Sequence, residues 1–168
     1  MKCYRKTIAT PVGEIILAAS EQAVMALLWN REDLPRLGLE FAPAGGTCDM
    51  LQRAEIQLGE YFRGSRKRFD LPLELRGTAF QRKVWAELEK IPFGATWSYR
   101  ELAERIGNPG AVRAVGTANG RNPVCILIPC HRVVRVSGDL GGYAGGLENK
   151  AFLLELEKEL DTVTGKGP

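Results

Sequence analysis

The chain is poor in histidine: His131 is the only one in 168 residues. Its four cysteines form no C-x-x-C pair, so the sequence predicts neither a sequence-local zinc site nor a disulfide framework. It also lacks an apolar run of transmembrane length and a convincing signal-peptide cleavage pattern. These absences favour a protein of the reducing cytoplasm with no membrane partner and no sequence-local zinc site.

The charge is unevenly distributed along the chain, although its net value is only +3. Residues 78–150 carry 10 Lys/Arg against 6 Asp/Glu, and all six basic residues within 98–135 are arginines. Basic charge concentrated in this way is a mild signal for a polyanionic partner such as nucleic acid. A solvated basic face remains the alternative at this point.

The patterning predicts an α+β fold in two parts. The first part, residues 1–76, reads as a small mixed-sheet domain with a strand meander followed by one amphipathic helix. The strands are expected at 4–9, 14–19 and 24–29, the helix at 50–62, and an edge strand or linker at 69–75. The second part, residues 77–168, reads as mostly helical, with the boundary at Arg76-Gly77.

Two short helices in the second part match a helix-turn-helix pattern. Ser98 and Glu101 have the spacing of a capping box, which predicts a helix from Ser98 to Gly107. A turn at Asn108-Pro109-Gly110 separates it from a helix at Ala111–Ala118. Upstream, Thr78 caps another predicted helix. A helix pair without DNA-binding function is the competing interpretation, because many such pairs bind no DNA.

The second helix of this pair is made of small residues, with Arg113 as its only charged side chain. Small side chains let a helix approach a partner closely, as in a confined groove, and a single arginine would then project from it. Tight packing against a neighbouring helix, with Arg113 merely solvated, is the alternative. Both can hold on opposite faces.

The dipeptide Cys130-His131 is the strongest chemical feature of the chain. A thiolate is the reactive form of cysteine, and an imidazole near the thiol can take its proton. The dipeptide ends an apolar run from Ile126 that predicts a buried strand. Neighbouring residues on a strand point to opposite faces, so their adjacency alone does not establish contact.

Glu157 falls on the apolar side of the predicted C-terminal helix. At about 100° per residue it lies about 40° from Leu153. A buried carboxylate needs a charged or hydrogen-bonding partner, and His131 is the natural candidate. A fraying helix end that turns Glu157 to solvent is an equally open interpretation.

The sequence is similar to a known family. Pro129-Cys130-His131-Arg132-Val133, with Asn122-Pro123 before it and the run from Gly141 to Leu147 after it, resembles the active-site signature of the O6-alkylguanine-DNA alkyltransferases. The resemblance is continuous from about Gly77 to Glu157. It implies a ribonuclease-H-like N-terminal domain, a winged-helix-like C-terminal domain and direct reversal of DNA alkylation without a cofactor.

The resemblance assigns a role to each site residue. Cys130 would accept the alkyl group once per molecule, His131 would take the thiol proton through a water, and Glu157 would orient the imidazole. Tyr99 would donate to the departing base, and Asn122 would hold the active-site turn. Contacts to double-stranded DNA, through its minor groove, would come from Tyr99, Arg100, Ala111, Arg113, Ala114, Thr117, Ala118 and Arg121. The pocket for the everted base would involve Val133, Tyr143, Ala144 and Gly145.

The family pattern is not matched everywhere. Some members bind zinc in the N-terminal domain, but one histidine provides too few ligands here. Position 144 is alanine where animal members have serine, which leaves the choice between O6-alkylguanine and O4-alkylthymine open. The resemblance implies a monomer, with clustering on DNA an open alternative.

Two other functions compete with alkyl transfer. One is a lesion-binding regulator of the same fold, which Cys130 argues against. The other is a thiol hydrolase that uses Cys130, His131 and Glu157, which the helix-turn-helix and Arg113 argue against.

Overall fold

The computed structural model describes residues 1–165 and divides into two compact units. The first unit comprises Met1–Arg76 and Pro123–Leu127, and the second comprises Gly77–Asn122 and the residues from Ile128 onward. A single boundary at Arg76-Gly77 does not describe the whole of this division. A five-residue segment from the later part of the chain belongs to the N-terminal unit.

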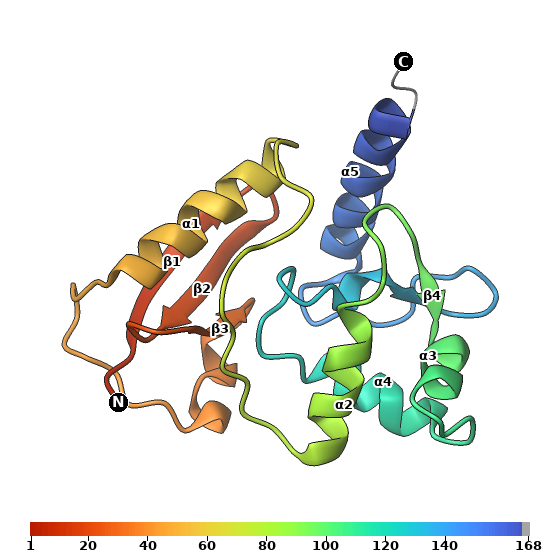
Figure 1. The fold of residues 1–168 in the computed structure, drawn as a ribbon, viewed down its shortest axis with the longest axis horizontal. Coiled ribbons are helices and arrows are strands. Elements are labelled where there is room, and N and C mark those ends of the chain that lie inside the picture. Colours follow the sequence, from red (N-terminus) through yellow and green to blue (C-terminus); the bar gives the residue numbers. More distant parts are fainter. Residues whose placement is uncertain (166–168) are drawn as a thin grey trace. The chain divides into compact units, whose positions relative to one another are not determined.

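The N-terminal unit is built on a three-stranded antiparallel sheet in the order β1-β2-β3 (Figure 1). Its elements are β1 (Tyr4–Thr10), β2 (Gly13–Ala19), β3 (Val24–Leu28), two short 3-10 turns at Arg31–Asp33 and Pro35–Leu37, and helix α1 (Asp49–Phe62). The register pairs Tyr4 with Ala19 and Thr10 with Gly13. Helix α1 packs against all three strands. The predicted meander and helix are confirmed.

Strand β3 is buried along its whole length, although it is the last strand of the sheet. Two segments cover its outer edge through isolated parallel bridges. Val24 exchanges backbone hydrogen bonds with Pro72 and Glu74, and Leu27 does so with Pro123 and Cys125. An edge strand exposes unpaired backbone groups to other chains, so this cover satisfies them within the unit. The sheet strands themselves are antiparallel, and parallel pairing in this unit is limited to such bridges among the described residues.

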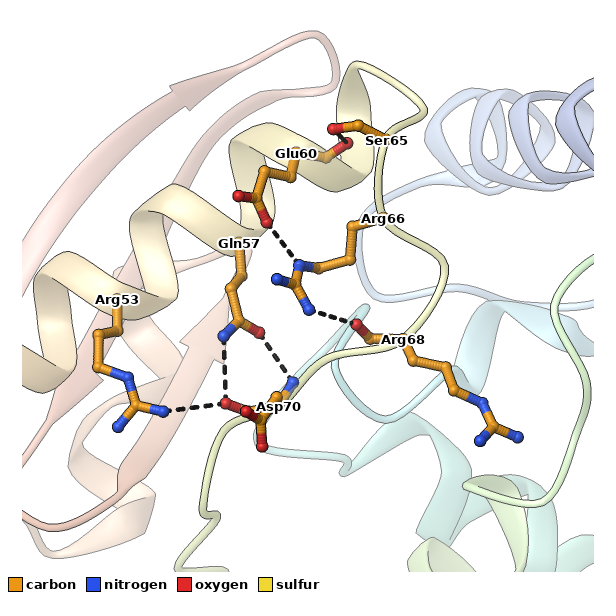
Figure 2. Close-up of polar contacts among 7 residues, drawn as sticks. All are labelled: Arg53, Gln57, Glu60, Ser65, Arg66, Arg68 and Asp70. Carbon is orange, nitrogen blue, oxygen red and sulfur yellow. Dashed lines mark hydrogen bonds and ion pairs between the residues drawn. The ribbon is translucent and has the colours of Figure 1, made fainter.

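The basic loop after α1 is tied back to that helix by side chains (Figure 2). Gln57 exchanges two hydrogen bonds with the backbone of Asp70, with lengths of 3.1 and 2.8 Å. Arg66 pairs with Glu60 at 2.6 Å and also donates to the carbonyl of Arg68. These contacts hold the segment that leads to residues 72–74 beside β3.

The second unit is mostly helical, as the sequence predicts. It contains α2 (Ala79–Leu88), β4 (Trp97–Ser98), α3 (Tyr99–Arg105), α4 (Val112–Gly120), a 3-10 turn at Cys130–Arg132, β5 (Val133–Val134) and α5 (Leu147–Gly165). Strands β4 and β5 form a two-stranded parallel ladder (Figure 1). The α+β fold is therefore confirmed. Within the described residues, no helix is long and apolar enough to cross a membrane.

Local sequence explains where these helices begin. Thr78 and Gln81 form a reciprocal capping box at α2. Ser98 caps α3 by accepting from the backbone of Glu101. The predicted return bond from Glu101 is replaced, because its carboxylate pairs with Arg105 one turn later at 3.1 Å. Trp85 of α2 donates from its indole to the carbonyl of Ala118, which fixes α4 against α2.

Candidate active site

Cys130 opens a 3-10 turn and is 4% exposed. The expected strand from Ile126 through this residue is wrong. Ile126 and Leu127 lie in a turn, and Ile126 has a left-handed backbone with φ of 72°. The run is buried as predicted, but its apolar residues pack in the interior without forming a β-strand. A short apolar run has no periodicity that distinguishes a buried strand from other buried backbone.

His131 and Glu157 meet in the interior of the second unit. Nε2 of His131 lies 2.7 Å from Oε1 of Glu157, and the two side chains are 0% and 1% exposed. A carboxylate only accepts hydrogen bonds, so Nε2 carries the proton and Nδ1 is the lone-pair nitrogen. Nδ1 is buried and has no hydrogen-bond partner among residues 1–165. Of the two interpretations of Glu157, the buried one is correct.

At neutral pH the imidazole of His131 is neutral and the carboxylate of Glu157 is ionised. Burial lowers the pKa of His131, and this effect outweighs the opposing charge of Glu157. Burial alone would raise the pKa of Glu157, but the charge that His131 acquires in acid, its hydrogen bond, and the hydrogen bonds and charge of Arg132 lower it to about 2. The contact at neutral pH is therefore a hydrogen bond from a neutral histidine to a carboxylate.

Two asparagines fix the backbone around the cysteine. Asn122 is 2% exposed and donates from Nδ2 to the carbonyl of Ile128 at 2.8 Å. Asn119, near the end of α4, donates from Nδ2 to the carbonyl of Cys130 at 3.3 Å. Sequence analysis identified Asn122 but missed Asn119, which has no motif of its own.

Tyr99 begins α3 and lies within electrostatic range of Cys130. Burial raises the pKa of its phenol, a thiolate at Cys130 raises it further, and Arg135 opposes the shift. The phenol therefore stays protonated and able to donate at neutral pH. Gly141 has φ of 72°, and a Cβ there would lie 3.1 Å from the ring and hydroxyl of Tyr99. Only glycine fits this approach without strain.

Lys150 is a buried cation that sequence analysis missed. Its Nζ donates to the carbonyls of Val133 at 2.6 Å, of Gly142 at 3.3 Å and of Leu140. These bonds hold the loop that leads into the predicted base pocket. Burial lowers the pKa of Lys150 to about 8, and a thiolate at Cys130 opposes this shift. The helical wheel could have found it, because it lies about 60° from Leu153, inside the same apolar arc as Glu157.

The predicted base-pocket residues lie in β5, which contains Val133, and in the loop that follows it. Val133 is buried, Tyr143 and Gly145 are half-buried and Ala144 is exposed. The carbonyl of Gly145 accepts from Asn149 of α5 at 2.7 Å, so α5 anchors this loop at both ends.

Helix α4 presents three of the predicted DNA-binding residues on its surface. Arg113, Ala114 and Thr117 are exposed, Ala111 is half-buried, and Arg100 and Arg121 are exposed nearby in the chain. Ala118 lies apart from this surface. It is 2% exposed because it shares the buried face of Val115, one turn earlier, and packs beneath Trp85. The packing interpretation is therefore confirmed for the buried face of α4, and the entry of its exposed face into a DNA groove stays a prediction.

No group of three His, Cys, Asp or Glu side chains in the described part of the chain is arranged to hold a metal ion. The chemistry available at the site is that of a thiol, an imidazole, a carboxylate and a phenol.

A helix-turn-helix unit that carries a cysteine beside a histidine–glutamate pair is typical of DNA-binding proteins with a cysteine nucleophile. Residues 79–159 match the DNA-binding domain of 6-O-methylguanine DNA methyltransferase, and residues 3–75 match its ribonuclease-like domain. The chain belongs to the 6-O-methylguanine DNA methyltransferase family.

Named relatives agree with this assignment. The chain is 45% identical over 155 residues to the methylated-DNA–protein-cysteine methyltransferase of Mycobacterium tuberculosis, covering 92% of each chain. It is also 45% identical over 158 residues to the constitutive enzyme of that name from Bacillus subtilis, covering 92% of this chain and 95% of the relative. A crystal structure of Mycobacterium tuberculosis OGT in complex with DNA superposes with a TM-score of 0.82 at 44% identity, covering 95% and 94% of the two chains.

Proposed function

We propose that this chain repairs alkylated double-stranded DNA by moving the alkyl group from O6 of guanine to Cys130. The observation that carries the proposal is the arrangement around His131. Its Nε2 is held by Glu157 while Nδ1, the basic nitrogen, is left without a partner among the described residues. A neutral, oriented imidazole next to a cysteine is the arrangement that activates a thiol nucleophile.

The reaction balances without a cofactor. The thiol proton passes from Cys130 to Nδ1 of His131, through a bridging water as the family resemblance implies. The sulfur attacks the alkyl carbon, a C–S bond forms and the bond from carbon to O6 breaks. Tyr99 gives a proton or hydrogen bond to the departing base, where negative charge accumulates. The resulting thioether has no water-labile bond, so each molecule acts once.

The target nucleotide must leave the base stack, because its O6 substituent cannot reach a protein thiol inside a duplex. Arg113 fills the vacated space beside the orphaned cytosine. The small residues Ala111, Ala114 and Thr117 pack in the minor groove, where short side chains let the helix approach the DNA closely. Tyr99, Arg100 and Arg121 contact the DNA backbone, so binding is independent of sequence context.

The everted base enters a pocket formed by Val133, Tyr143, Ala144 and Gly145, with Asn122 holding the active-site turn. The exposed Ala144 provides no hydroxyl for the O6 oxygen, so O4-alkylthymine is a further candidate substrate. The protein acts as a monomer in this proposal.

The test is a single-turnover assay with a duplex oligonucleotide that carries O6-methylguanine. The protein is digested afterwards and the mass of the peptide containing Cys130 is measured. One added methyl group there, with unmodified guanine in the DNA, is the expected result. Cys125→Ala, which removes a buried thiol five residues away, is the matched control and should still be methylated at Cys130.

The other outcomes identify the competing functions. Binding to the lesion without a mass change would indicate a regulator. Turnover of an acyl substrate, with no transfer from DNA, would indicate a thiol hydrolase.

A further inference from the structure

Arg132 follows His131 directly, and its guanidinium is almost completely buried. It donates from Nη1 to the carbonyl of Ile91 at 2.7 Å, and Cζ lies 5.5 Å from the centre of the Phe93 ring. Its other two contacts go to a single carboxylate, that of Glu157, from Nε at 2.8 Å and from Nη2 at 2.9 Å. This two-pronged geometry is the strongest form of an arginine–carboxylate pair.

The same carboxylate also binds the histidine. Oε1 of Glu157 accepts from both Nη2 of Arg132 and Nε2 of His131, whereas Oε2 accepts from Nε of Arg132. A buried carboxylate requires a compensating cation. Arginine is always protonated in proteins, so it provides that cation at every pH of interest.

We propose that Arg132 is a positioning residue that keeps His131 uncharged in the free protein, so that Nδ1 remains available to accept the thiol proton. The proposal rests on the proposed function. With Arg132 present, Glu157 is already neutralised and binds the imidazole only as a hydrogen-bond acceptor. Without it, His131 would be the nearest group able to neutralise Glu157, and it would bind a proton before the reaction begins.

The other charges around His131 agree with this assignment. Glu157 and Lys150 face it from α5, and Arg132 and Cys130 adjoin it in the 3-10 turn. Burial lowers the pKa of His131, Glu157 raises it, and Arg132 and Lys150 lower it. Arg132 lowers the pKa of His131 by its charge, as Lys150 does. It differs from Lys150 because it also bonds directly to the carboxylate of Glu157.

A lysine at position 132 would not provide the same geometry, because the guanidinium of Arg132 also donates to the carbonyl of Ile91. The guanidinium donates to two elements at once, α5 and the segment that follows α2. An ammonium group can provide the charge but not the planar fork. Charge and geometry can therefore be separated by substitution.

Because the chain has one histidine, its protonation can be followed directly by NMR of the imidazole in the full-length protein without DNA. In the wild type we expect a neutral ring at pH 7 with the proton on Nε2. In Arg132→Gln we expect the titration midpoint to rise by about one pH unit or more, the lower range for an opposite charge at close distance. In Arg132→Lys, which keeps the charge, the midpoint should stay near the wild-type value.

The matched control is Arg66→Gln, which removes an arginine–glutamate pair in the N-terminal unit (Figure 2). It should leave the midpoint unchanged. An unchanged midpoint in Arg132→Gln, or an equal rise in Arg132→Lys, would overturn the proposal. If Arg132→Gln fails to fold, the wild-type titration decides, because an imidazolium at pH 7 contradicts the proposal by itself.

Transfer kinetics provide a second measurement. The pH at which methyl transfer by Arg132→Gln becomes half-maximal should rise by the same amount as the NMR midpoint. The NMR result does not depend on DNA, so a failure of this inference is distinguishable from a failure of the proposed function, which would appear as absence of transfer in the wild type.

Discussion

Asn119 of α4 donates a hydrogen bond from Nδ2 to the backbone carbonyl of Cys130 at 3.3 Å. The helix proposed to enter the DNA groove is thus bonded directly to the proposed nucleophile. The exposed face of α4 carries Arg113, while its buried face carries Asn119. Binding of DNA to one face can therefore fix the position of the cysteine behind the other.

Replacement of the cysteine should separate binding from chemistry. We expect Cys130→Ala to abolish methyl transfer completely and to leave the affinity for duplex DNA unchanged. The reason is that Cys130 is buried, and its contact with Asn119 uses the backbone carbonyl, which alanine retains. Peptide mass measures transfer and fluorescence anisotropy measures affinity. Residual methylation at another residue would refute the assignment of the nucleophile.

Arg113 should matter for duplex DNA and not for the chemical step. Eversion of a base costs a few kcal/mol, which an inserted side chain offsets in part. If Arg113→Ala loses about 1.4 kcal/mol of this compensation, transfer from a duplex slows about tenfold. Transfer from free O6-methylguanine base should keep its wild-type rate. Equal slowing on both substrates would show that Arg113 does not act in eversion.

Lys150 should be essential for the loop that precedes the proposed base pocket. Lys150→Met leaves the carbonyls of Val133, Leu140 and Gly142 without their buried donor. An unsatisfied buried polar group costs about 1–3 kcal/mol, so we expect the free energy of unfolding to fall by at least about 2 kcal/mol. Denaturant unfolding measures this change. Lys158→Met, at an exposed position of the same helix, should have little effect, and a similar loss there would contradict the explanation.

The elements that could be predicted from the sequence share one property. Each is encoded by a periodic pattern of apolar residues or by a few neighbouring residues. The meander and α1 depend on alternation and helical spacing, and the starts of α2 and α3 depend on the capping residues Thr78 and Ser98. Glu157 was located by the same helical spacing, which places one carboxylate among leucines. Its partner His131 could be inferred because the chain offers no second histidine.

The parts that sequence analysis missed depend on contacts between distant segments. Ile126 turns with a positive φ because both ends of its loop are fixed elsewhere, at Leu27 and by Asn122. A β-branched residue rarely adopts this conformation, so no local rule predicts it. Arg132 belongs to the recognised motif, but its bonds to Glu157 and Ile91 appear only when three elements are packed together.

Acid should destabilise the folded protein through the His131–Glu157 pair. The pKa of His131 is lowered in the folded state, so below about pH 6.5 the unfolded chain binds a proton that the folded chain does not, and stability falls. The pKa of Glu157 is lowered from 4.5 to about 2. Its contribution is fully present above pH 4.5 and is lost as the pH falls toward 2. For a buried carboxylate this shift corresponds to about 3 kcal/mol.

Both effects have the same sign, so the free energy of unfolding should decrease continuously from pH 7 to pH 3. His131→Gln retains a donor to Glu157 but cannot titrate, and it should flatten the curve between pH 7 and pH 5 only. Glu60→Gln, which removes a partly exposed carboxylate paired with Arg66 and no histidine, should leave the slope between pH 7 and pH 5 unchanged. Urea unfolding at fixed ionic strength measures each curve. A wild-type curve that is flat from pH 7 to pH 5 would mean that His131 binds its proton equally well in the folded and the unfolded states, which contradicts a pKa lowered by burial.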